Sequence, residues 1–165
     1  MIYPRVLVVS NQSFSDSTSN GRTLGTLFKG WPHDKLRQFC ISLNNPDTSV
    51  CTDYFAVSDS EALKSFLSLG LNQDKDNSVT LGSNPKNNRS QGLNKTAIIV
   101  SVRNIVWSTG LWKSSKFREW LDDFKPQIVV FQSGDSAFMA DIARNIAKKY
   151  GARIVIFNTE GYIFF

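Results

Sequence analysis

Apolar runs of the kind that form buried strands recur along the chain, and polar residues follow each of them. Residues 6–9, Val-Leu-Val-Val, are rich in β-branched side chains, which is typical of a strand covered on both faces of a parallel sheet. Residues 127–132 and 153–157 repeat the pattern, so we expect them to be buried strands as well. Alternating apolar residues at 36–43 and a short apolar run at 53–57 predict further strands.

Apolar residues at helical spacing lie between these strands. The spacing predicts helices over residues 20–31, 59–69, 96–107, 117–124 and 136–150. The first is expected to bury one stripe and to stop before Pro32, the stripe being Leu24, Leu27, Phe28 and Trp31. The third is expected to bury a stripe made of Ile98, Val102, Ile105 and Val106.

Alternation of strands and helices predicts an α/β fold, here a Rossmann-like three-layer domain with a mostly parallel sheet. The chain's 165 residues are enough for a single domain with its own core. Residues 72–95 are polar and contain no aromatic side chain, so we expect a loop or linker there. Apolar residues follow the last strand directly, which indicates a truncated, N-terminal part of a longer α/β protein.

Polar residues stand where three of the predicted buried strands end. They are Ser10 and Asn11 after the first, Ser133, Gly134 and Asp135 after the second, and Asn158, Thr159 and Glu160 after the third. The carboxyl ends of parallel strands lie on one edge of a sheet, where α/β proteins bind their ligands. We therefore expect these residues to converge on a site. The alternative is that they are turn formers and helix caps, a reading strongest for Ser133 and Asp135.

Asn20 and Gly21 open the first helix, where free backbone N–H groups could bind a phosphate or a sugar hydroxyl. The alternative is a flexible turn with an N-cap. The glycine pattern of dinucleotide-binding proteins and the P-loop lysine are both missing, which disfavours a fragment of an NAD enzyme. His33 is the single histidine, and no triad or metal cluster forms around it in the sequence. We expect no metal and no cofactor of the chain's own.

Composition narrows the classes of partner. The net charge is +5, but the Lys and Arg residues are scattered, so we expect no nucleic-acid partner. Scattered positive charge fits weak attraction to anionic substrates or to an anionic membrane surface. No segment approaches the roughly 20 apolar residues of a membrane span, and we expect a cytoplasmic protein. Cys40 and Cys51 are then free, buried thiols.

Several segments together resemble bacterial GT-B glycosyltransferases of the family 4-like kind. They are the strand and polar loop at 6–16, Asn-Gly-Arg-Thr-Leu at 20–24, Phe-Lys-Gly-Trp-Pro at 28–32, residues 120–135, and residues 154–160. The resemblance covers both ends of the chain well and the middle poorly. Strands with polar ends also occur in many other α/β proteins.

The resemblance implies two Rossmann-like domains facing a cleft, of which this chain is the N-terminal, acceptor-side one. It implies a glycan or lipid-linked acceptor in bacterial surface polysaccharide synthesis, at the inner face of the membrane. The nucleotide-sugar would bind mainly to the missing C-terminal domain, so this chain alone is expected to be inactive. By position, Asp135 and Glu160 resemble the polar groups beside the reacting sugar, and Asn20 and Gly21 the first loop near donor and acceptor. The alternative is a flavodoxin-like module that binds a small ligand or a protein without catalysis.

Overall fold

The computed structural model describes residues 3–70, 92–134 and 136–158. The chain forms two compact units: residues 1–58 with 113–165, here the sheet unit, and residues 59–112, here the helical unit. In the described part, no helix is long and apolar enough to cross a membrane.

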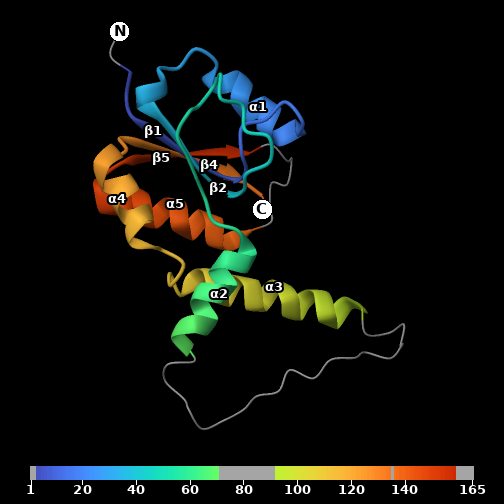
Figure 1. The fold of residues 1–165 in the computed structure, drawn as a ribbon. Coiled ribbons are helices and arrows are strands. Elements are labelled where there is room, and N and C mark those ends of the chain that lie inside the picture. Colours follow the sequence, from blue (N-terminus) through green and yellow to red (C-terminus); the bar gives the residue numbers. More distant parts are fainter. Residues whose placement is uncertain (1–2, 71–91, 135, 159–165) are drawn as a thin grey trace. The chain divides into compact units, whose positions relative to one another are not determined.

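The sheet unit is built on five parallel strands (Figure 1). They are β1 Val6–Gln12, β2 Leu36–Ser42, β3 Tyr54–Ala56, β4 Ile128–Ser133 and β5 Arg153–Asn158. Their order is β3-β2-β1-β4-β5. After β1 the chain adds β2 and then β3 on one side of β1. It later adds β4 and β5 on the other side of β1, so the topological switch point lies between β1 and β4. This confirms the Rossmann-like α/β fold, and the order differs from the 2-1-3-4-5 order of flavodoxin-like sheets.

Helices cover both faces of the sheet. On one face lies α1 (Ser19–Phe28), whose Leu24 and Phe28 join an apolar cluster with Val6, Val8 and Leu36. The other face carries α4 (Ser115–Phe124), where Phe117 contacts the rings of β2 and β3, and α5 (Ala137–Tyr150), which lies on β4, β1 and β5. A short 3-10 helix, η1 (His33–Lys35), leads into β2.

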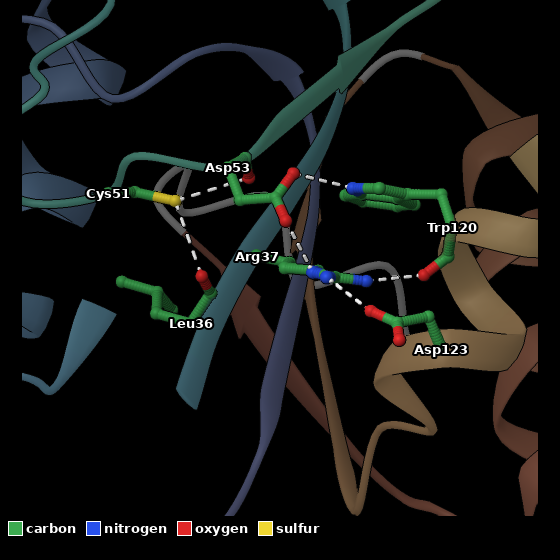
Figure 2. A network of polar contacts seen from close by, with 6 residues as sticks. All are labelled: Leu36, Arg37, Cys51, Asp53, Trp120 and Asp123. Carbon is green, nitrogen blue, oxygen red and sulfur yellow. Dashed lines mark hydrogen bonds and ion pairs between the residues drawn. The ribbon is translucent and has the colours of Figure 1, made fainter. Parts of the chain in front are cut away.

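A polar network near the start of β2 ties the strand to α4 (Figure 2). Arg37 Nε pairs with an Asp53 carboxylate oxygen at 2.6 Å, and its Nη2 pairs with Asp123 Oδ2 at 2.8 Å. Trp120 Nε1 donates to the second oxygen of Asp53 at 2.6 Å. The guanidinium also lies over the rings of Trp120 and Phe124. We interpret the network as a structural clasp, because each of its polar groups is engaged with another.

The helical unit contains α2 (Asp59–Gly70) and α3 (Gly92–Ser108). Asp59 Oδ1 accepts hydrogen bonds from Arg103 Nε and Trp107 Nε1, each at 2.8 Å, so one carboxylate joins the start of α2 to α3. Helix α3 begins inside the segment predicted as the polar loop 72–95, of which residues 72–91 lie outside the described part.

The structure corrects three packing predictions. Helix α1 ends at Phe28 because Gly30, at φ +83°, turns the chain, so Trp31 lies beyond it; Leu27 is 54% exposed. In α3, Ile98, Val102 and Ile105 are exposed, whereas Val106 is buried as predicted, and Trp107 beside it is buried too. The third predicted buried strand, β5, lies at a sheet edge, and its Ile154, Val155 and Ile156 are exposed. Apolar runs predict where strands and helices lie along the chain. They do not predict the order of the strands in the sheet, or which face of an element is covered by a neighbouring element.

Candidate functional site

The carboxyl ends of β1, β4 and β5 lie side by side. The side-chain Nδ2 of Asn11 is 3.1 Å from the position that a β-carbon on Gly134 would occupy. Ser133 Oγ donates to Asn158 Oδ1 at 2.8 Å, across the β4–β5 pair. The prediction that these strands run parallel is confirmed, and polar groups from all of them meet at one edge. We call this set the polar rim; it comprises Ser10, Asn11, Gln132, Ser133, Gly134 and Asn158.

Two buried polar atoms of the rim have no hydrogen-bond partner among the described residues: Asn11 Oδ1 and Gln132 Nε2. Gln132 is only 6% exposed. A buried donor or acceptor without a partner costs about 1–3 kcal/mol, and such atoms in native proteins usually bind water or a ligand. One of these atoms is an acceptor and the other a donor, and they belong to β1 and β4, the two strands on either side of the switch point.

Gln38 holds the loop that follows β1, a role that the sequence pattern did not predict. Its Oε1 accepts from the backbone N–H of Phe14 at 2.8 Å, and its Nε2 donates to Ser10 Oγ at 2.7 Å and to the Gln12 carbonyl at 3.1 Å. Gln38 is fully buried. Its amide therefore fixes the exit of β1 and orients Ser10 in the rim. The only signal in the sequence was that Gln38 shares its face of the strand with two apolar residues, Leu36 and Cys40.

Gly21 is a packing residue. A β-carbon there would lie 2.7 Å from the Ser13 carbonyl oxygen and 2.9 Å from the Ser15 nitrogen. Thr18 is the N-cap of α1, and its Oγ1 accepts from the Gly21 N–H at 3.1 Å. That N–H is thus occupied, and the glycine instead lets the start of α1 approach the loop after β1. Asn20 is half-buried in the first turn of α1.

The structure describes some of the remaining predicted site residues and does not describe others. Asp135, Thr159 and Glu160 lie outside the described residues. Ser133 is not a helix cap, because the N-cap of α5 is Ser136. The reading of Ser133 as a cap was therefore wrong, and its hydroxyl bonds to Asn158 instead.

Other residues with potential chemistry have structural surroundings. His33 is exposed, and its Nε2 lies 3.2 Å from the Ser49 carbonyl oxygen. Cys40 and Cys51 are buried free thiols, as predicted, and burial raises their pKa values to about 12 and about 11. Such thiols are protonated at neutral pH and are poor nucleophiles. Trp107 and Trp112 are buried, as expected of packing residues.

The described rim residues are all uncharged: hydroxyls, carboxamides and one glycine. Neutral donors and acceptors suit hydroxyl groups, whereas a diphosphate normally requires cationic side chains or helix N-termini. Within the described ranges, no group of three His, Cys, Asp or Glu side chains could hold a metal ion.

Comparisons of this chain with protein-family models, with curated proteins and with solved structures find no match.

Proposed function

We propose that the chain is the acceptor-binding domain of a GT-B glycosyltransferase that acts in bacterial surface polysaccharide synthesis. The acceptor is a glycan or a lipid-linked sugar, and its hydroxyl receives a sugar from a nucleotide-sugar. The donor binds mainly to a second domain, so residues 1–165 bind acceptor but do not transfer sugar. The proposal combines the sequence resemblance with the chemistry of the polar rim.

One observation carries the proposal: unpartnered buried polar atoms lie at the switch point of the sheet. Asn11 Oδ1 can accept from a hydroxyl, and Gln132 Nε2 can donate to one. A sugar hydroxyl both donates and accepts, so hydroxyls of the acceptor have the chemistry to pair with either atom. The absence of charge among the described rim residues favours a neutral acceptor over the diphosphate of the donor.

The resemblance gives Asp135 and Glu160 the role of orienting or activating the acceptor hydroxyl. A carboxylate near the attacking oxygen can take its proton as the new glycosidic bond forms. The departing diphosphate would be stabilised by charges of the donor domain.

Saturation-transfer NMR with unlabelled mono- and disaccharides tests acceptor binding. We expect transfer from the protein to the sugar protons, and at least a threefold weaker signal in Ser133→Ala and Asn158→Ala. Thr23→Ala is the matched control, because Thr23 is an exposed residue of α1 outside the rim. The proposal fails if neither rim substitution changes the signal, or if no sugar gives a signal.

We also propose that a lipid-linked acceptor brings the domain to the inner face of the membrane. The net charge of +5 supports weak attraction to anionic lipids, which screening by salt would reduce. Sedimentation with vesicles of phosphatidylglycerol and phosphatidylcholine, at low and high salt, tests this directly. Equal sedimentation with vesicles of phosphatidylcholine alone would contradict an electrostatic attraction.

A further inference from the structure

A polar cavity lies in the sheet unit, apart from the polar rim. It has a volume of about 200 Å³ and lies between α1 and the segment of residues 43–53 that joins β2 to β3. Arg22, Thr26 and Lys29 form the wall on α1. Asp47 and Ser49 form the facing wall.

Hydrogen bonds fix the wall that faces α1. Asp47 Oδ1 accepts from the Ser49 backbone N–H at 2.9 Å and from the Ser49 hydroxyl at 2.6 Å. The backbone N–H of Asp47 donates to the Phe14 carbonyl at 2.8 Å. At one end of the cavity, Arg22 Nη2 donates to the Asp16 carbonyl at 2.6 Å. The polar groups are therefore held in place before any ligand arrives, which reduces the entropy lost on binding.

The charges that line the cavity cancel. Arg22 and Lys29 contribute two positive charges, and Asp16 and Asp47 contribute two negative ones. The hydrogen bonds from Ser49 hold the pKa of Asp47 below its usual value, with a smaller contribution from Lys29, so its carboxylate is ionised at neutral pH. An anion would face two carboxylates and a cation two basic groups, whereas an uncharged ligand with many hydroxyls can bond to all of them.

The floor of the cavity is formed by Gly25, which has no side chain, and by the apolar Val50. Gly25 leaves open space above Val50, since a β-carbon on Gly25 would lie 3.8 Å from Val50 Cγ2, an ordinary contact distance. The C–H face of a sugar ring can rest on such a floor. A volume of about 200 Å³ is many times the roughly 10–15 Å³ that one water needs, which is room for a single sugar ring.

We infer that this cavity is a second saccharide site, which binds one neutral monosaccharide unit between α1 and residues 43–53. The carboxylates of Asp16 and Asp47 accept from sugar hydroxyls, while Arg22, Lys29 and Thr26 donate to sugar oxygens. The site goes beyond the proposed acceptor function and does not depend on the rim.

The test follows backbone amide shifts of ¹⁵N-labelled protein during titration with glucose, galactose and N-acetylglucosamine, and separately with inorganic phosphate. We expect sugar-dependent shifts at Arg22, Thr26 and Ser49. Gly25→Leu should abolish these shifts, because its side chain fills the cavity. Gly25→Ala should weaken them while raising the melting temperature, because alanine favours the helix. Thr23→Ala is the control and should keep them.

Each contrary outcome counts against the inference. Shifts with phosphate and none with the sugars would show an anion site instead. Sugar-dependent shifts that persist in Gly25→Leu would show that the sugar binds elsewhere. Ser133→Ala should leave the shifts at the cavity unchanged. Absence of sugar binding at the rim and absence of sugar binding at the cavity therefore give different results.

Discussion

Asn11 and Gly134, which are 123 positions apart in the sequence, meet beyond the last paired residues of β1 and β4, and the Asn11 amide nitrogen occupies space beside the glycine. A β-carbon on Gly134 would lie 3.1 Å from that nitrogen, closer than an ordinary contact. The small residue thus lets the carboxamide lie against the exit of β4. The pair links two of the three strands whose ends form the polar rim.

Replacing Gly134 by alanine is expected to displace the Asn11 carboxamide by a few tenths of an ångström. Only the end of a side chain must move, so the free energy of unfolding should fall by less than about 1 kcal/mol. The double variant Asn11→Ala/Gly134→Ala should lose less stability than the sum of the single variants, with a coupling of about 0.5–1 kcal/mol. Urea denaturation of the four proteins measures this coupling, and strict additivity would show that the two residues do not interact.

Two glycines of α1 should respond in opposite ways to alanine. Gly21→Ala places a methyl group against the backbone of residues 13 and 15, and we expect a loss of about 1–3 kcal/mol of stability. Gly25→Ala meets no obstruction and should gain up to about 1 kcal/mol from helix propensity. Thermal unfolding of both variants checks the contrast. A gain of stability in Gly21→Ala would contradict the close packing of α1 on the loop.

Gln38→Leu removes the partner of the buried Phe14 N–H. An unsatisfied buried donor costs about 1–3 kcal/mol, so the variant should lose at least this amount of stability. The loop after β1 should also loosen, which hydrogen exchange at the Phe14 amide measures directly. Gln12→Ala is a control at an exposed position, since only its backbone carbonyl takes part in the network. Unchanged protection of Phe14 in Gln38→Leu would refute this role.

Arg37 should contribute more to stability than its partner Asp123. The Arg37 side chain is 16% exposed and bonds to Asp53 and Asp123 while lying on two rings, so Arg37→Lys should cost about 1–2 kcal/mol. Asp123 is exposed, and Asp123→Ala should cost less than about 0.5 kcal/mol. Denaturation of both variants measures the difference, and similar losses in both would argue against the clasp.

Because of the two buried thiols, the free energy of unfolding should depend on pH in the alkaline range. Burial raises the pKa of Cys40 to about 12 and that of Cys51 to about 11. The unfolded chain loses these protons nearer its ordinary pKa of about 8.5, so it binds fewer protons than the folded chain above that pH. The free energy of unfolding should therefore fall as pH rises from about 9 toward 11. Double replacement by serine or alanine should flatten this fall, and an identical slope in the double variant would contradict the assignment.

Local patterns predicted the elements well, because β-branched runs and helical spacing depend on nearby residues. They predicted the parallel strands and the polar residues at the ends of β1, β4 and β5. The exposure of Ile156 and the order of the strands could not be predicted, because both depend on which segments distant in sequence become neighbours. The same holds for Gln38, whose partners lie on the loop after β1, and for the approach of Asn11 to Gly134.

If residues 1–165 bind the acceptor, the uncharged polar rim is where its sugar binds. Mapping backbone amide shifts of ¹⁵N-labelled protein during titration with candidate acceptor disaccharides tests it most directly. We expect saturable shifts at Asn11, Gln132, Ser133 and Asn158, and we expect Ser133→Ala to weaken them. Saturable binding that leaves these amides unmoved would contradict it, and so would a rim that responds to inorganic phosphate and to no sugar.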